Sequence, residues 1–196
     1  PGVMQAIDSF VQRGGTFAAT YICGQVDEND LCFLGGFPGP LRGTLGIWCE
    51  EVDALYPEDC NSLNWNGKNY AVHDLCELIH AESAQTLGTY GSDFYAGQPA
   101  LTVNNVGKGK AYFIAARTGA DFIKDFYQML VKESGVKRAF QAELPKGVTA
   151  QVRSDGKTDY VFLMNFNPSP VLVNCGEQGE KNLSPFECVI LELQKN

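Results

Sequence analysis

This 196-residue sequence lacks the features of a membrane-spanning or nucleic-acid-binding protein. No apolar run approaches the roughly 20 residues that a helix needs to cross a bilayer, and no basic segment leads into an apolar one at the start. The 15 basic residues are scattered among 23 acidic ones, so the net charge is −8 and no basic face is available to neutralise phosphates. We expect no membrane partner, no nucleic-acid partner and no cofactor.

Cysteine pairs of the C-x-x-C type are also missing. The seven cysteines are odd in number and stand at positions 23, 32, 49, 60, 76, 175 and 188. This pattern predicts neither a disulfide framework nor a zinc site. Reduced thiols are typical of the cytoplasm, which is the localisation we expect.

The first twenty residues predict a helix followed by a strand. The apolar residues at helical spacing are Val3, Ile7, Phe10 and Val11. Gly14 and Gly15 supply the left-handed stop of this helix. The run from Thr16 to Ile22 is short, β-prone and apolar on both faces, which favours a strand buried in a parallel sheet with helices on either side. A doubly wound sheet normally has a strand before its first helix, so we expect an upstream strand to be missing here.

Further along, the sequence predicts more strands, a late helix and then a change of pattern. Extended segments are expected at 47–52, 75–81, 85–90, 100–104 and 110–116, and a helix at 120–133. Around residues 141–146 the pattern becomes alternating, so we predict a first domain at 1–142 and a small all-β domain at 147–196. In the second domain, strands are expected at 149–153, 160–165, 171–174 and 188–193.

Cys23 is the candidate nucleophile, because it follows the first predicted strand and precedes Gly24. A glutamine amidotransferase would place glycines on both sides of its cysteine and a helix directly after it, whereas an acidic loop follows here. Cys23 is therefore interpreted as a small core residue. His73 and His80 are seven apart, so a single strand would point them to opposite faces, and we interpret both as structural, with His80 in or near an interface.

The acidic loop of Asp27, Glu28, Asn29 and Asp30 gathers oxygen ligands that suit a hard cation. It lacks the alternating ligand spacing and the distant bidentate glutamate of a calcium loop, so we predict no metal site. We expect these side chains to cap backbone amides of residues 24–31, or to reach Arg42 or a neighbouring subunit.

Several segments, taken in order, carry a family resemblance. They are ATY with the G-x-VDEND run at 24–30, LGGFPGPLR at 34–42, LCELIHAE at 75–82, TYGSDFYAG at 89–97 and GKGKAYFIAAR at 107–117. The sequence closely resembles the trimerisation domain of the bacterial β-galactosidases of glycoside hydrolase family 42. In that family a catalytic barrel comes first, a flavodoxin-like domain related to class I glutamine amidotransferases follows, and a small β-sandwich ends the chain.

The resemblance implies the fold class and the function. We expect an α/β flavodoxin-like, class I glutamine amidotransferase-like three-layer sandwich, followed by a small all-β antiparallel domain. The chain would be the non-catalytic part of an enzyme that hydrolyses terminal β-D-galactosides with retention. Its partners would be two further copies in a homotrimer and the parent catalytic barrel, with galactosides bound only through the parent active site.

No catalytic residue is expected in this chain. A glycosidase needs two carboxylates about 5 to 10 Å apart across the scissile bond. Glu50 and Glu51 are adjacent on a predicted strand, with Asp53 close by, and adjacent strand residues point to opposite faces. No segment resembles the family's catalytic stretches, whose glutamates lie on barrel strands.

The expected functional feature is instead a subunit interface. The segment LGGFPGPLR is apolar and poor in charge, which suits a turn packed against another chain. The predicted interface residues are Asp27, Glu28, Asn29, Asp30, Phe37, Pro38 and Arg42. Exposed aromatic residues would serve as sugar platforms, but we interpret Phe33, Phe37, Trp48, Trp65, Phe94 and Tyr95 as core or interface anchors.

Two alternatives remain open from the sequence. The first is a divergent amidotransferase-like thiol hydrolase that uses Cys23 or another cysteine with His73 or His80. The second is a carbohydrate-binding module, which requires an exposed aromatic platform.

Overall fold

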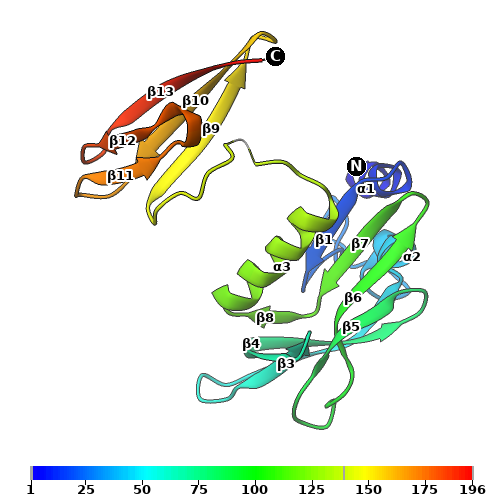
Figure 1. Cartoon of the computed structure of the whole chain (residues 1–196). Coiled ribbons are helices and arrows are strands. Elements are labelled where there is room, and N and C mark those ends of the chain that lie inside the picture. The colour runs from blue at the N-terminus through cyan, green and yellow to red at the C-terminus, as the bar shows by residue number, and fades with distance from the viewer. Residues whose placement is uncertain (1, 139, 196) are drawn as a thin grey trace. The chain divides into compact units, whose positions relative to one another are not determined.

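The computed structural model of the chain describes residues 2–138 and 140–195. These divide into two compact units, Pro1–Ser134 and Gly135–Asn196, each with a core of its own (Figure 1). Unit 1 combines a sheet with helices, and unit 2 consists of antiparallel strands. A mixed α/β domain followed by a small antiparallel β domain is therefore confirmed. No helix of the described residues is long and apolar enough to cross a membrane.

The described residues of unit 1 form three α-helices, one short 3-10 helix and eight strands. The helices are α1 Val3–Gln12, η1 Gly39–Leu41, α2 Arg42–Leu45 and α3 Ala120–Glu133. The strands are β1 Thr16–Thr20, β2 Ile47–Ala54, β3 Asn61–Trp65, β4 Lys68–Ala81, β5 Gln85–Tyr90, β6 Pro99–Val106, β7 Gly109–Ile114 and β8 Ala116–Thr118. The predicted α3 is confirmed to the residue, and so is β5.

The eight strands form one sheet in the order β1-β7-β6-β5-β3-β4-β2, and β8 pairs with β4. Among the described pairings, β1 with β7 is the parallel one, with Phe17 opposite Ala111, and the others in this sheet are antiparallel. The prediction of a β1 strand buried on both faces is wrong. β1 lies at the edge of the sheet, where Ala18 and Thr20 are exposed and Ala19 is buried.

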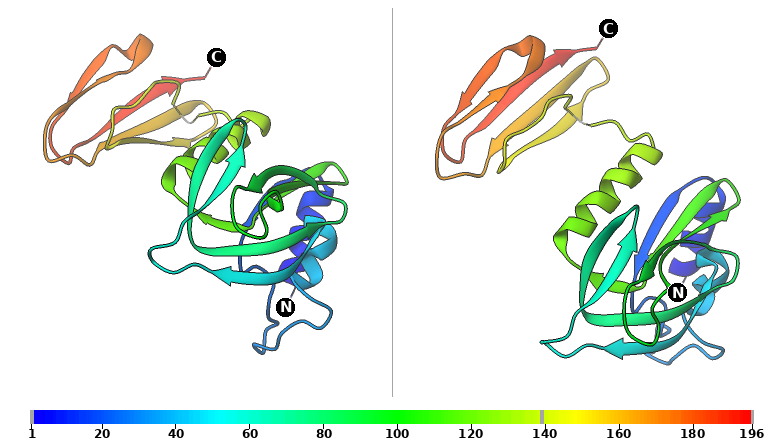
Figure 2. Two further views of the ribbon diagram at one scale, coloured as in Figure 1. Left: turned by 90° about the horizontal axis from the view of Figure 1, so that it is seen from below. Right: turned by 60° about the horizontal axis from the view of Figure 1, so that its bottom comes forward.

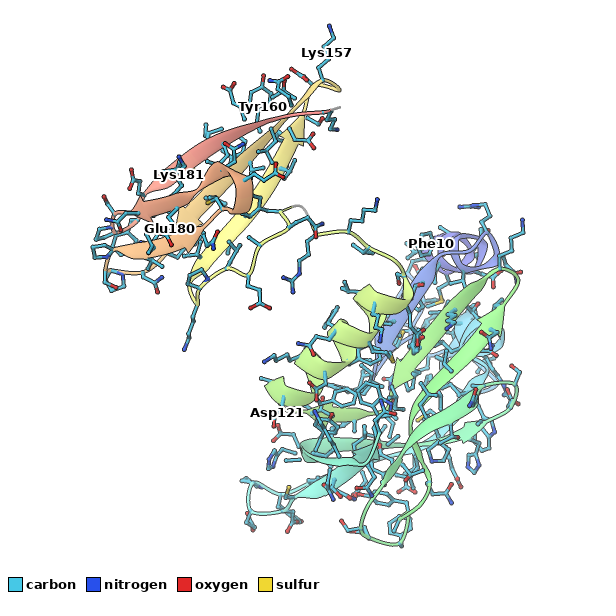
Figure 3. The ribbon with its side chains drawn as sticks, in the orientation of Figure 1. Phe10, Asp121, Lys157, Tyr160, Glu180 and Lys181 are labelled. Atoms are coloured by element: carbon cyan, nitrogen blue, oxygen red, sulfur yellow. The ribbon has the colours of Figure 1, made fainter. Side chains whose placement is uncertain are left out.

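Helices cover both faces of the β1 and β7 end of the sheet. β7 alternates between two cores, since Tyr112 and Ile114 pack with α3 residues such as Phe122, whereas Ala111 and Phe113 pack with α1 and α2. Figure 2 shows α3 and α1 on opposite sides of these strands. The amphipathic pattern of α3 explains its position, because Phe122, Phe126 and Leu130 are its buried residues; Figure 3 shows Asp121 at its first turn.

One hairpin of unit 1 was missed by the sequence analysis. No strand was predicted between the segments at 47–52 and 75–81, but β3 and β4 pair from Asn61 and Val72 to Trp65 and Lys68. Asn66 and Gly67 connect the two strands with φ of 51° and 73°. An Asn-Gly pair that takes two positive φ values is a strong hairpin signal, so this turn could have been found.

Within the part of unit 2 that the structure describes there are five strands, β9 Val148–Ser154, β10 Thr158–Asn165, β11 Val171–Asn174, β12 Glu180–Leu183 and β13 Cys188–Gln194, and one short 3-10 helix, η2 Gly176–Gln178. A three-stranded sheet has the order β13-β10-β9, and β11 pairs with β12. Side chains such as Val161, Leu163 and Val173 form the core between them. β12 was not predicted, because its sequence EKNL is mostly polar and gives no apolar alternation.

Candidate subunit interface

A long loop, residues 21–41, connects β1 to α2 and contains most of the predicted interface residues. Its first half is a small hairpin closed by an antiparallel bridge between Val26 and Cys32. The backbone N–H of Asp27 donates to the carbonyl of Leu31 at 2.9 Å, and that of Phe33 donates to Gln25 at 3.0 Å. The loop therefore has a defined backbone, and its last three residues form the 3-10 helix η1.

Asp27 holds the turn of this hairpin. Its Oδ1 accepts the backbone N–H of Asn29 at 2.8 Å and of Leu31 at 3.0 Å, so the expected capping role is confirmed for this residue. Glu28, Asn29 and Asp30 are exposed around it. Among the described residues, no ion pair is formed by Glu28 or Asp30, and both residues are exposed.

Two glycines allow the loop to fold back on itself. Gly24 has φ of 64°, and a Cβ there would lie 2.4 Å from the carbonyl oxygen of Pro38. Gly39 has φ of 56°, and a Cβ there would lie 2.5 Å from the ring of Phe33. Only glycine fits both the positive φ and the close approach. These contacts explain the glycine-rich composition of the segment.

The second half of the loop is attached to β2 and to the chain after β4. The carbonyl of Phe37 accepts the N–H of Cys49 at 2.9 Å, and Pro38 is buried within unit 1. Arg42 donates from Nε and Nη2 to the Glu82 carboxylate at 2.8 and 2.5 Å, and Nη1 lies 3.5 Å from the carbonyl of Gly35. The expectation that the acidic loop reaches Arg42 within the same chain is wrong, because Glu82 occupies its guanidinium.

An aromatic stack next to Arg42 was not found from the sequence. Trp48 on β2 and His80 on β4 stack with ring centroids 4.4 Å apart, because they are paired residues of adjacent strands. His80 Nε2 lies 2.5 Å from Glu50 Oε2, and the Arg42 guanidinium lies 5.9 Å from the Trp48 ring centroid. Tryptophan and arginine are enriched at interface hot spots, so this surface extends the candidate interface.

Large apolar side chains are exposed along the loop. Ile22 is 52% exposed, Leu31 64% and Leu34 100%, and Val26 is also exposed. Single exposed apolar residues are common on soluble proteins, but here four lie within thirteen residues of one ordered loop. A segment this rich in exposed apolar side chains is a candidate for a surface that another chain covers.

The entry of the loop is fixed by a buried carboxylate on β4. Glu77 is 2% exposed, and its Oε1 accepts the backbone N–H of Ile22 at 2.8 Å. Ile22 has φ of 56°, an unfavourable conformation for a β-branched residue. Burial raises the pKa of the Glu77 carboxyl, against the opposing effect of the Ile22 hydrogen bond. A nucleophile on a strained turn would be expected directly after the strand, with a positive φ. In this chain that conformation belongs to Ile22, whose side chain is not nucleophilic.

Cys23 is poorly suited to act as a nucleophile. It is half-buried and packs against the α1 side of the sheet. Burial, and then the charge of Glu77, raises the pKa of its thiol, and the same causes raise the pKa of Cys49 to about 12. A thiol nucleophile needs a lowered pKa, so both environments disfavour thiolate chemistry.

The structure brings one cysteine and one histidine together. Cys60 Sγ lies 4.0 Å from His73 Nε2 on the exposed side of the β3–β4 hairpin, while the thiol donates to the Asn61 carbonyl at 3.2 Å. His80 instead stacks on Trp48 and contacts Glu50. The two histidines therefore have separate surroundings.

Two of the six candidate sugar platforms are buried in the core of unit 1. Trp65 and Tyr95 are 5% and 1% exposed, and Tyr95 donates its hydroxyl to Asp53 at 2.6 Å. Phe94 is largely exposed, although its ring forms a T-shaped pair with that of Tyr95. Phe33 and Phe37 are half-buried in the loop. The aromatic residues thus serve the core and the loop, as the sequence predicted for Trp65 and Tyr95.

Comparison with known proteins identifies relatives over almost the whole chain. The family model described as the β-galactosidase trimerisation domain matches residues 1–137, and the β-galactosidase C-terminal domain matches residues 147–193. The chain is 53% identical to β-galactosidase Pbg of Clostridium perfringens over 99% of its length, and 50% identical to β-galactosidase BglY of Alicyclobacillus acidocaldarius over 86%. It spans only 29% and 25% of those two proteins. A solved β-galactosidase from Rahnella sp. R3 is 46% identical, with a TM-score of 0.90 over 99% of this chain and 30% of that one.

Proposed function

Since this chain belongs to glycoside hydrolase family 42, matching its trimerisation and C-terminal domains, we propose that it is the assembly portion of a β-galactosidase. The parent enzyme would hydrolyse terminal β-D-galactosides with retention, and this chain alone would be inactive. The names of its relatives support the substrate class, and the matched regions are the non-catalytic ones. Neither a thiol hydrolase nor a carbohydrate-binding module is favoured by these relatives.

The partners that we propose are two further copies of the chain and the catalytic barrel of the parent. Galactosides would reach the protein only at the parent active site. The observation that supports self-association most directly is the ordered loop 21–41, which exposes Ile22, Val26, Leu31 and Leu34. A loop whose backbone is already fixed loses little conformational freedom when another chain covers it.

The seven predicted interface residues contribute to this surface in two ways. Glu28, Asn29 and Asp30 are exposed and available to a partner, and the Arg42 guanidinium is part-exposed beside Trp48. Asp27, Phe37 and Pro38 shape the loop from within, through hydrogen bonds and packing. We retain all seven as the proposed interface, with these separate roles.

We also propose the finer description of the fold. The parallel pair β1–β7, with α1 and α3 on opposite faces, is consistent with a flavodoxin-like, amidotransferase-like three-layer sandwich. A longer chain in which a preceding strand pairs in parallel with β1 would support this description. We place the domains at 1–142 and 147–196. The seven cysteines are unpaired, which supports a cytoplasmic location.

The test is the solution mass of the polypeptide across a concentration series, with β-galactosidase activity measured on the same fractions. We expect a species of three 21.4 kDa chains without activity. A monomer at every concentration would contradict the assembly function of this chain. Activity that co-migrates with the protein would contradict the assignment of the catalytic carboxylates to the parent barrel.

A further inference from the structure

Leu34 is the most exposed large apolar residue of the described chain, at 100%. It is not on a loose segment. Phe33, its neighbour, donates its N–H to Gln25 and packs its ring against Gly39, and Gly35 on the other side lies against Arg42. The loop thus presents one apolar side chain on a fixed backbone, a form that suits insertion into a pocket on a partner.

A pocket of about 340 Å³ opens on the same unit, between α1 and the hairpin at 25–33. Val3 and Met4 of α1 form one wall, and Val26 and Phe33 of the loop form the other. Val3 is 67% exposed and Val26 42%, so these walls have little apolar cover within the chain. The pocket is suited to receive an apolar side chain.

Charges at the two places are complementary. Asp27 and Glu28 line the pocket, and no ion pair is formed by Glu28 within the described residues. Beside Leu34, the Arg42 guanidinium approaches the carbonyl of Gly35 and is 41% exposed, although Glu82 binds two of its nitrogens. A part-exposed arginine has N–H groups left to donate to a second carboxylate. Arg42 beside Leu34 is therefore the donor, and the carboxylates of Asp27 and Glu28 in the pocket are the acceptors.

A closed ring of three copies needs two different patches that fit each other, because each joint is heterologous. Building on the proposed assembly function, we propose that Leu34 of each copy inserts into the Val3, Met4, Val26 and Phe33 pocket of the next, with Arg42 facing Glu28. The occupant of the pocket is therefore a second copy of this chain. Burial of a leucine at this joint makes Leu34→Ala weaken association by on the order of 10- to 100-fold.

The test uses two variants of the full chain and their mixture, measured by sedimentation or light scattering. Leu34→Asp removes the inserted side chain, and Val26→Asp places a charge in the pocket. Each variant alone is expected to be a monomer. An equimolar mixture has one intact joint, between Leu34 of the Val26→Asp chain and the pocket of the Leu34→Asp chain, so it should form a one-to-one dimer that cannot close into a ring.

Two further variants keep the result decisive. Glu28→Arg changes an exposed pocket residue and cannot disturb the core, so it should weaken association even if Val26→Asp fails to fold. Leu172→Asp, on an exposed residue of unit 2, should leave the trimer unchanged. If wild type is a trimer and the Leu34→Asp variant also forms a trimer, or if the mixture stays monomeric, the proposed joint is wrong but the assembly function stands. A wild-type monomer overturns both.

Discussion

Asp125 and Glu133 lie eight residues apart in α3, and each carboxylate accepts one lysine and one tyrosine from the sheet. Asp125 Oδ2 accepts Lys68 Nζ at 2.6 Å and the Tyr70 hydroxyl at 2.8 Å. Glu133 Oε2 accepts Lys110 Nζ at 2.7 Å and the Tyr112 hydroxyl at 2.7 Å. Two matching pairs of hydrogen bonds therefore hold the middle of α3 against β4 and its C-terminal end against β7.

Replacing Tyr112 by phenylalanine removes one of these contacts without changing the packing of the ring. We expect Tyr112→Phe to lower the free energy of unfolding by about 1.5 kcal/mol, the lower end for a hydrogen bond to a charged group, because Glu133 keeps its contact with Lys110. Tyr127→Phe is the matched control, since Tyr127 is 58% exposed on the same helix. Urea unfolding measures both, and equal effects would contradict a role for the Tyr112–Glu133 bond.

The same contacts predict a loss of stability in acid. Hydrogen bonds from the lysines and tyrosines lower the pKa of Asp125 and of Glu133. Their contribution is therefore complete above the ordinary pKa of these groups and is lost as the pH falls through the lowered values. In Lys110→Met, stability should fall less steeply with acid than in wild type, as urea titrations at several pH values can measure.

Substitutions of Glu77 test whether its carboxylate fixes the start of the loop at 21–41. Glu77→Leu leaves the N–H of Ile22 without its acceptor, so we expect a loss of about 1–3 kcal/mol. Glu77→Gln retains a carbonyl acceptor and should cost less. Glu51→Leu, at an exposed position of β2, should change stability by less than about 0.5 kcal/mol. If Glu77→Leu proved as mild as Glu51→Leu in chemical unfolding, the hydrogen bond to Ile22 would not hold the loop.

The pH dependence of Glu77 is opposite in sign to that of the α3 carboxylates. Burial raises its pKa in the folded chain, so the folded state binds this proton more tightly than the unfolded state. Relative to Glu77→Gln, wild type should be most stable below the ordinary pKa of glutamate and should lose stability as the pH rises towards the raised value. A difference between the two proteins that is constant with pH would contradict this assignment.

Thiol labelling tests the interpretation of the cysteines. The exposed thiols Cys32, Cys60 and Cys188 should react rapidly with a disulfide reagent in the native chain. Cys49, Cys76 and Cys175 are buried with raised pKa values, so they should react only as fast as the chain unfolds. Rapid labelling of Cys23, identified by peptide mass mapping, would reopen the thiol-hydrolase alternative.

A buried amide in unit 2 tests the independence of the two units. Asn165 donates from Nδ2 to the carbonyls of Ser169 and Ser184, each at 2.9 Å, and its Oδ1 accepts the N–H of Asn167. Asn165→Ala should destabilise unit 2 by about 1–3 kcal/mol, because those buried groups lose their partner. Asn182→Ala, an exposed change, should have little effect.

Because the cores of the two units are separate, the Asn165→Ala effect should appear in one thermal transition only. Near-ultraviolet spectra can follow unit 1 through Trp48 and Trp65, since both tryptophans of the chain lie there. An equal shift of the tryptophan-detected transition would show that the units unfold together.

Apolar periodicity was sufficient to locate α3, whose stripe of Phe122, Phe126 and Leu130 determines both its helical state and its buried face. It was not sufficient for β1, since an apolar run predicts burial but cannot say that the strand lies at a sheet edge. β3 is polar at alternate positions, and only the turn at Asn66 and Gly67 could have revealed it.

The sequence predicted which loop residues belong to the candidate site, but not which residues they contact. The glycines and prolines of the loop at 21–41 indicated an unusual turn, whereas the partner of Arg42 is Glu82, forty residues away. The Trp48–His80 stack and the Ile22–Glu77 bond depend on which strands are neighbours. No local pattern encodes that pairing, because it is decided by the packing of the whole sheet.

The edge position of β1 has a consequence for how the chain associates. Among the described strands β1 pairs with β7 alone, so its other side can pair either with a preceding strand of a longer chain, as proposed above, or with a strand of a second copy. Pairing of two sheets through their edge strands gives a dimer or an open-ended chain of copies, whereas the proposed ring closes with three copies. Pairing through the β1 edge and closure of the trimer through the Leu34 joint therefore depend differently on protein concentration. The number of chains per particle at the highest concentration shows which of these two surfaces of unit 1 binds the other copies more tightly.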